Sequence, residues 1–189
     1  MNPIEQLKAS LLAAPIVWKG DYAYFVHPIT DGVPRIDPEL MLAVVEEIEA
    51  EVDWDEVDLL VGIEAMGLPL ATLLSVRNHK PLIIARKRPY ALEGEVKVDQ
   101  STGYSKGELY LNDLHPGERV LMVDDVLSTG GTMRAMIRGV RACGAEVSRI
   151  VIVIEKGDGL SLLRQETDID IRSLLKVDMD GGQVVFPGS

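Results

Sequence analysis

The sequence has few of the features that mark disulfide-bonded, membrane-spanning or secreted proteins. Its one cysteine, Cys143, excludes an internal disulfide, and its place in a helical pattern indicates a core residue rather than a nucleophile. The apolar runs, such as residues 150–154, are far shorter than the ~20 residues that a membrane span needs. The opening residues show no basic region followed by an apolar run, so no secretory signal is predicted. These absences predict a cytoplasmic protein.

Basic residues are scarce relative to acidic ones. The chain has 19 Lys and Arg against 30 Asp and Glu, which gives a net charge of −11. A surface of that sign repels nucleic-acid phosphates and anionic membranes, so neither is expected as a partner. A small anion is still compatible with this charge, because it needs only a local cluster of donors. The three histidines lie far apart without ligand spacing, so no metal site made by the protein alone is predicted.

What the sequence does contain is the composition of one folded domain. Its 189 residues are 47% hydrophobic and 26% charged, which is typical of a single soluble domain. Apolar spacing predicts an N-terminal helix, a strand and a second helix, followed by short apolar strands that alternate with helices. This alternation predicts an α/β fold, a twisted parallel sheet flanked by helices, with ligands beyond the carboxyl ends of the strands. The predicted helices are 5–13, 38–51, 68–76 and 132–144, and the predicted strands are 22–26, 57–63, 81–85, 118–125 and 147–155.

The strongest local signal is the segment VLMVDDVLSTGGTM at residues 120–133. An apolar strand leads to two adjacent carboxylates, Asp124 and Asp125, and then to a turn before a helix. Glycines in the turn let backbone N–H groups converge, hydroxyl side chains add donors, and the helix N-terminus adds partial positive charge, which together predict a phosphate cradle. The carboxylates suit the hydroxyls of a sugar attached to that phosphate, or positive charge developing on the sugar. The residues of the cradle are Ser128, Thr129, Gly130, Gly131 and Thr132.

Residues 120–132 resemble the signature of the type I phosphoribosyltransferases, which consists of an apolar run, two acidic residues and a Thr-Gly-Gly-Thr loop. In that family the acidic pair binds the ribose hydroxyls of phosphoribosyl pyrophosphate (PRPP), and the loop binds its 5′-phosphate. The resemblance therefore implies that Asp124 and Asp125 bind ribose and that residues 128–132 bind phosphate. It also implies Mg²⁺, bound mainly through PRPP oxygens and water as this hard ion prefers, and a homodimer.

Three more segments are assigned to pyrophosphate. After strand 57–63 the family uses the amides of a short loop, although Met66 stands here where an Arg is often found, and an ordinary strand–helix turn is the alternative. After strand 81–85 come three cations, which suit a pyrophosphate clamp or a solvated rim. Residues 90–107 are polar with little periodicity, which predicts a flexible lid loop that excludes water, and a lysine there reaches pyrophosphate or stays solvated. The residues assigned are Ala65, Met66, Gly67, Arg86, Lys87, Arg88 and Lys106.

A further resemblance concerns the base. The segments VHPITDGVPRIDPEL, QSTGYSKG and EKGDG are similar to archaeal hypoxanthine/guanine phosphoribosyltransferases, which share the architecture of adenine phosphoribosyltransferases. The resemblance implies a small N-terminal hood within residues 1–50, in which Val33, Pro34 and Arg35 cover the purine; a structural turn is the alternative. Lys156 corresponds to a lysine that donates to O6 of a 6-oxopurine, although it also fits an exposed strand end.

The sequence therefore predicts a single-domain purine phosphoribosyltransferase over residues 1–189. It would make IMP or GMP from hypoxanthine or guanine and PRPP, with release of pyrophosphate, in purine salvage. Two departures leave the general acid/base unassigned: Ser128 stands where many 6-oxopurine enzymes have an Asp, and Gly103 where adenine enzymes tend to have a Glu. An adenine phosphoribosyltransferase is the alternative within this class. A PRPP-binding regulatory protein without catalysis is the alternative from another class.

Overall fold

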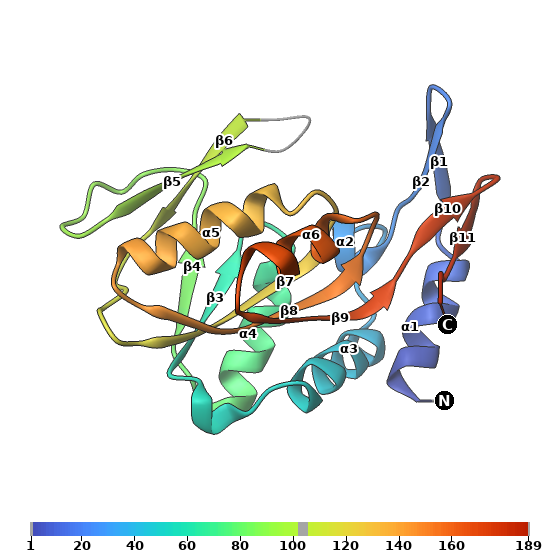
Figure 1. The fold of residues 1–189 in the computed structure, drawn as a ribbon. Coiled ribbons are helices and arrows are strands. Elements are labelled where there is room, and N and C mark those ends of the chain that lie inside the picture. Colours follow the sequence, from blue (N-terminus) through green and yellow to red (C-terminus); the bar gives the residue numbers. More distant parts are fainter. Residues whose placement is uncertain (1, 102–105, 189) are drawn as a thin grey trace.

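The computed structural model describes residues 2–101 and 106–188, and its centre is a five-stranded sheet of order β4-β3-β7-β8-β9 (Figure 1). Every neighbouring pair in this sheet is parallel. The carboxyl ends of the strands therefore meet along one edge, as the alternation of strands and helices predicted. The strands are β3 (Leu59–Ile63), β4 (Leu82–Ala85), β7 (Arg119–Leu127), β8 (Glu146–Glu155) and β9 (Asp170–Lys176).

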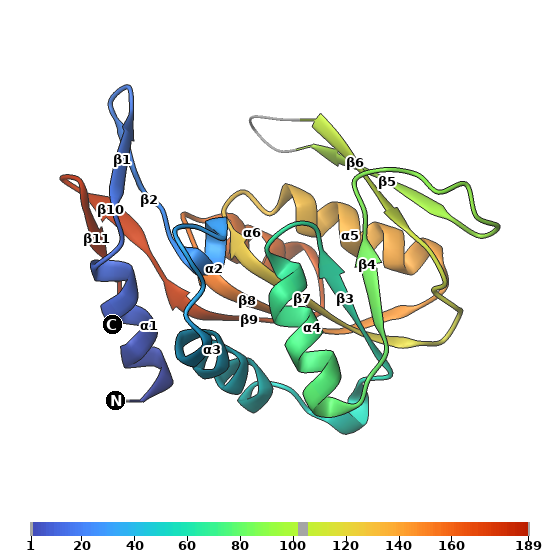
Figure 2. The same ribbon diagram turned by 180° about the vertical axis from the view of Figure 1, so that it is seen from behind.

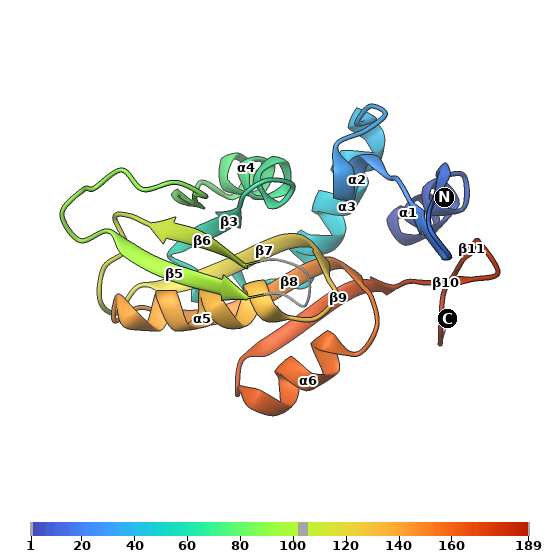
Figure 3. The same cartoon turned by 90° about the horizontal axis from the view of Figure 1, so that it is seen from above.

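Helices cover both faces of this sheet, and the side chains of β7 alternate between the two cores that result. Leu121 and Val123 belong to the core under α3 and α4, whereas Val120 and Met122 belong to the core under α5 and α6. Figure 3 shows the two helical layers with the sheet between them. The helices are α3 (Pro38–Ala50), α4 (Gly67–Asn78), α5 (Gly131–Ala142) and α6 (Gly159–Glu166), and a short 3-10 turn, Trp54–Glu56, precedes β3.

The two ends of the chain form a lobe beside the end of β9 (Figure 2). Trp18 of the N-terminal hairpin lies against Gly182 of a C-terminal hairpin, where an added Cβ would be 2.8 Å from the indole ring. The hood predicted from residues 1–50 thus has a C-terminal neighbour that the sequence did not indicate. The elements of this lobe are α1 (Pro3–Leu12), β1 (Ile16–Lys19), β2 (Tyr22–Phe25), α2 (Pro28–Asp31), β10 (Asp178–Asp180) and β11 (Gln183–Val185).

The prediction of a loop over residues 90–107 is wrong for much of its length. β5 (Val96–Ser101) pairs antiparallel with β6 (Lys106–Leu111). Val98 and Leu111 are buried against α5, where Gly139 provides the space that Val98 fills. Because each strand contributes so few apolar residues, their alternation was too short to detect. Residues 102–105, which include Gly103, lie outside the described residues, as does the side chain of Lys106.

The prediction of Cys143 as a core residue is also wrong. It is only half-buried, because it lies at the C-terminal end of α5, where the helix leaves the sheet. Burial raises the pKa of its thiol, which makes it a poor nucleophile at neutral pH. Among the described residues, no helix is both long enough and apolar enough to span a membrane.

Candidate functional site

The two adjacent carboxylates lie within β7, as they do in the predicted strand 118–125. The strand runs to Leu127, two residues beyond its predicted end, so Asp124 and Asp125 occupy successive positions whose side chains point to opposite faces. Asp124 lines a pocket of about 200 Å³ together with residues 126–133. Asp125 is buried on the other side, where the charge of Asp31 from α2 reaches it. The acid pair therefore borders both the pocket and the hood.

Burial and mutual repulsion make this pair costly to ionise. Burial raises the pKa of Asp124 well above its usual range, and the charge of Asp125 raises it further. Burial likewise raises the pKa of Asp125, to about 6. Lys87 acts in the opposite direction on Asp124 through its charge, but no described Lys or Arg forms an ion pair with either carboxylate. A ligand that brings hydroxyl donors or a cation would relieve this repulsion.

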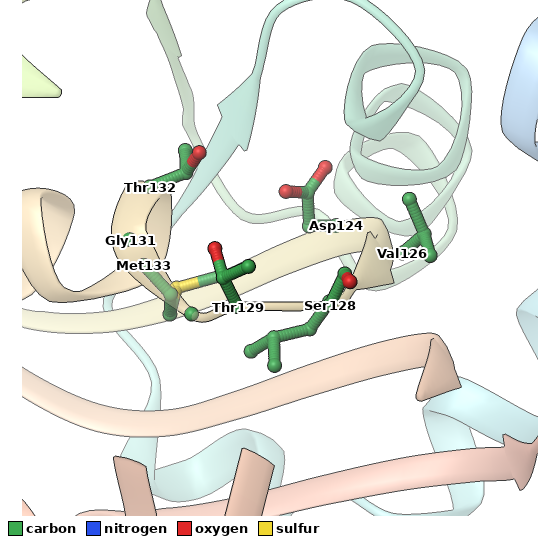
Figure 4. A pocket seen from close by; sticks show the side chains of 9 residues that line it. Asp124, Val126, Ser128, Thr129, Gly131, Thr132 and Met133 are labelled. Atoms are coloured by element: carbon green, nitrogen blue, oxygen red, sulfur yellow. The ribbon is translucent and has the colours of Figure 1, made fainter. Parts of the chain in front are cut away.

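The predicted phosphate loop, Ser128–Thr132, forms the wall of the pocket (Figure 4). Gly130 has a φ of 76°, which a residue with a side chain rarely adopts, and it is the N-cap of α5. Gly130 itself offers no side chain to cap this helix start, where the partial positive charge of the helix dipole favours an anion. In Figure 4 the carboxylate of Asp124 and the hydroxyl of Thr129 lie on the same side of β7. The loop has the geometry of an anion cradle beside a carboxylate.

The segment that follows β3 also lies beside Asp124. Gly67 begins α4 so close to β7 that an added Cβ would be 2.9 Å from the carbonyl oxygen of Val123 and 3.0 Å from Asp124 Oδ1. Met66 is the N-cap of α4 and, in the part of the chain that the structure describes, no side chain caps this helix either. The peptide between Glu64 and Ala65 is cis. Two uncapped helix starts thus flank Asp124.

Glu64 links the third strand end to the second, and the sequence analysis missed it. Its Oε2 accepts the backbone N–H of Lys87 at 3.0 Å and lies 3.2 Å from Arg86 Nε. Arg86 and Lys87 are thereby held beside the start of α4. Arg88 has no described contact with Glu64; its guanidinium lies 5.1 Å from the centroid of the Tyr90 ring, over which Arg86 also lies at 5.8 Å. A carboxylate directly after an apolar strand was the available signal for Glu64.

The residues predicted to bind the purine differ in their surroundings. Lys156 donates its backbone N–H to the carbonyl of Leu127, and its Nζ lies 4.7 Å from the centroid of the Phe25 ring in β2. This contact brings Lys156 to the hood. Val33, Pro34 and Arg35 are exposed. Their connection to the site is Gly32, where an added Cβ would be 3.2 Å from Met66 Sδ.

A family model described as the phosphoribosyl transferase domain matches residues 37–187. The hypoxanthine/guanine phosphoribosyltransferase of Methanotorris igneus is 50% identical over 180 residues, covering 95% of this chain and 98% of that protein. A protein of the same name from Methanobacterium paludis is 48% identical over 185 residues, covering 98% and 97%.

Solved structures agree with the fold. The adenine phosphoribosyltransferase of Rhodothermus marinus has a TM-score of 0.75 at 24% identity, over 92% of this chain and 98% of that chain. That of Giardia lamblia has a TM-score of 0.76 at 19% identity, over 95% and 99%. At such identities the likeness concerns the fold alone. With the family model, the sequence relatives and the convergence of three strand ends on Asp124, the chain belongs to the phosphoribosyltransferase family.

Proposed function

We propose that this protein transfers the ribose 5-phosphate group of PRPP to hypoxanthine or guanine, with release of pyrophosphate. The bond between ribose C1 and pyrophosphate breaks, a bond from C1 to a purine nitrogen forms, and the purine gives up a proton. The observation that carries the proposal is the meeting of an anion cradle, a buried acid pair and the start of α4 at one edge of the sheet. The names of the sequence relatives support the purine substrates.

Each part of PRPP has a matching group in the site. The loop Ser128–Thr132 would hold the 5′-phosphate, since its hydroxyls and the start of α5 are donors. Asp124 would accept hydrogen bonds from the ribose hydroxyls, and Asp125 would carry charge on the hood side of the sugar. The start of α4 with Arg86 and Lys87 would bind pyrophosphate. This order places the ribose between the two anionic groups.

The residues present fit a magnesium ion that is bound together with substrate. Asp124 and Asp125 offer carboxylate oxygens, the ligands that this hard cation prefers, and their mutual repulsion favours a cation nearby. In the described part of the chain, no three His, Cys, Asp or Glu side chains gather closely enough to hold a metal. PRPP oxygens and water would therefore complete the coordination. Bound Mg²⁺ would neutralise charge on the leaving pyrophosphate.

Catalysis in this site rests on orientation and charge. Helix starts and basic side chains stabilise negative charge that develops on pyrophosphate, and buried carboxylates stabilise positive charge that develops on ribose. Lys156 would donate to the 6-oxo group of hypoxanthine or guanine from its position on Phe25. The 6-amino group of adenine offers that donor no acceptor, so the site favours 6-oxopurines.

The test is an assay with PRPP, Mg²⁺ and, in turn, hypoxanthine, guanine, adenine and xanthine. We expect IMP and GMP, and more than about a hundredfold loss of turnover when Asp124 is replaced by Asn, because charge stabilisation of that size is typical of such sites. Asp113→Asn is the matched control, because Asp113 is exposed on a loop. AMP as the main product would indicate an adenine phosphoribosyltransferase. PRPP binding without turnover of any base would indicate a regulatory protein.

A further inference from the structure

The phosphate loop is supported by an arginine that lies outside it. Arg134, in the first turn of α5, reaches back so that its Nη1 donates to the carbonyl oxygen of Thr129 at 2.7 Å. Its backbone N–H donates to the carbonyl oxygen of Gly130 at 2.9 Å. In a trans peptide the carbonyl and the following N–H point in opposite directions. With both carbonyls turned to Arg134, the N–H groups of Gly130 and Gly131 face the other way, as an anion cradle requires.

Glu166 holds the guanidinium of Arg134 in place. Arg134 Nε lies 2.5 Å from Glu166 Oε2, and Nη2 donates to Oε1 at 3.0 Å. The two donors facing Glu166 and the third facing Thr129 use the fixed fork of the guanidinium, which a lysine ammonium cannot reproduce. The ion pair with Arg134 also lowers the pKa of Glu166, so the carboxylate stays charged at neutral pH.

Both ends of helix α6 support the loop. Glu166 is its last residue and Gly159 its first. Gly159 packs so tightly on the loop that an added Cβ would be 2.7 Å from the carbonyl carbons of Ser128 and Thr129. The loop is therefore fixed between Gly159 on one side and Arg134 on the other, and one short helix determines both contacts.

The ion pair contributes little to global stability. The side chains of Arg134 and Glu166 are 26% and 50% exposed, and ion pairs in such surroundings typically stabilise a fold by less than about 1 kcal/mol. We propose that Arg134, held by Glu166, is a positioning residue for the 5′-phosphate of PRPP, because its guanidinium sets the orientation of the peptide between Thr129 and Gly130. This inference rests on the proposed function, which assigns the 5′-phosphate to this loop.

The experiment compares kcat and the KM values for PRPP and hypoxanthine in three variants. Arg134→Gln should raise the KM for PRPP about tenfold or more and leave the KM for hypoxanthine within about threefold, since one hydrogen bond to a charged group is worth about that much. Arg134→Lys should show most of the same increase although it keeps the charge. Glu166→Gln should raise the KM for PRPP by about three- to fivefold, because the guanidinium keeps a weaker partner.

Arg141→Gln is the matched control. Arg141 lies two turns further along α5 and pairs with Asp168 at 3.1 Å, an exposed ion pair of the same kind that has no described contact with the loop. Its replacement should change no KM by more than about twofold. Thermal unfolding of each variant checks folding, and Glu166→Gln decides the question where Arg134→Gln is unstable.

Three results would overturn the positioning role. Equal effects of Arg134→Gln and Arg141→Gln would show that only the net charge of the protein matters. Wild-type kinetics of Arg134→Lys would show that the fork geometry of the guanidinium is not needed. Thr132→Val separates this inference from the proposed function, because Thr132 belongs to the cradle itself. An unchanged KM for PRPP in Thr132→Val would refute the cradle. A raised value there, with no change in Arg134→Gln, would refute only the role of Arg134.

Discussion

Thr132 is the residue at which a small chemical change tests the cradle most directly. Valine is close to threonine in shape but lacks the hydroxyl, and a lost hydrogen bond to a charged group costs roughly 1.5–3 kcal/mol. We therefore expect Thr132→Val to weaken PRPP binding about ten- to a hundredfold in titration calorimetry with Mg²⁺. Thr72→Val, on the exposed side of α4, is the control and should bind PRPP like the wild type. Equal affinities of both variants would contradict the cradle.

Lys156 carries the prediction about the base. A donor opposite adenine would be left unpaired, and a site built around such a donor discriminates by up to several orders of magnitude. We expect the wild type to convert hypoxanthine and guanine far faster than adenine, and Lys156→Met to reduce that ratio, measured as kcat/KM for each base. Lys19→Met is the control, because Lys19 stacks on Tyr24 at the same 4.7 Å from a ring in β2. A preference for adenine, or an unchanged ratio in Lys156→Met, would show that Lys156 does not select the base.

At the residue scale, sequence reasoning located the groups that belong to one continuous motif. Asp124 and the phosphate loop were predicted, because a strand, two carboxylates and a Gly-rich turn follow each other without interruption. Glu64, Arg134 and Glu166 were missed, because each acts through a partner far away in the sequence. Charged residues near strand and helix ends are too common for such pairs to be identified without a structure.

At the scale of elements, the central sheet was predictable and its attachments were less so. Buried strands such as β3 and β8 consist of continuous apolar residues that a sequence shows directly. The hairpin β5–β6 becomes recognisable only through its packing on α5. The predicted start of α3 is confirmed, since Asp37 accepts the N–H of Leu40 and Pro38 occupies the first turn.

The contact between α1 and the start of α2 depends on a neutral histidine. His27 is buried, its Nδ1 accepts the N–H of Ile29, and its Nε2 lies 2.8 Å from Ser10 Oγ in α1. Burial lowers the pKa of His27 to about 4, despite the nearby Asp31. At His27 the folded state therefore binds fewer protons than the unfolded state between pH 6.5 and about 4, so the contribution of His27 to stability falls as the pH falls through this range.

The loss attributable to His27 amounts to roughly 3 kcal/mol at full protonation of the unfolded state. Asp125, whose pKa is raised to about 6, acts in the opposite direction below that pH. The measurement is thus the difference between wild type and His27→Gln in urea unfolding at several pH values. The wild type should lose stability relative to the variant as the pH falls from 6.5 to 4. Parallel pH profiles would show that His27 titrates normally in the folded protein.

At the scale of the whole molecule, we expect two copies to associate through the side of the sheet where β4 and α4 lie. β4 is an outer strand, and the side chains of Val76 in α4 and Ile84 in β4 are 68% and 37% exposed. Burying such apolar area stabilises association. We expect a homodimer in light scattering at micromolar concentration, and a monomer after Ile84→Glu. Leu12→Glu, an equally drastic change of an exposed residue in α1, should leave the dimer intact. A monomeric wild type would contradict this prediction.

The bracing of the phosphate loop by α6 also bears on biosynthesis. A chain leaves the ribosome N-terminus first, so residues 128–132 emerge well before Gly159 and Glu166. A nascent chain that has released residues 1–158 already carries every side chain assigned to substrate. It still lacks both supports of the loop, and Arg134 has no carboxylate to hold it. Both supports of the loop therefore form only after α6 has left the ribosome, and a product truncated before α6 should bind PRPP more weakly than the full chain.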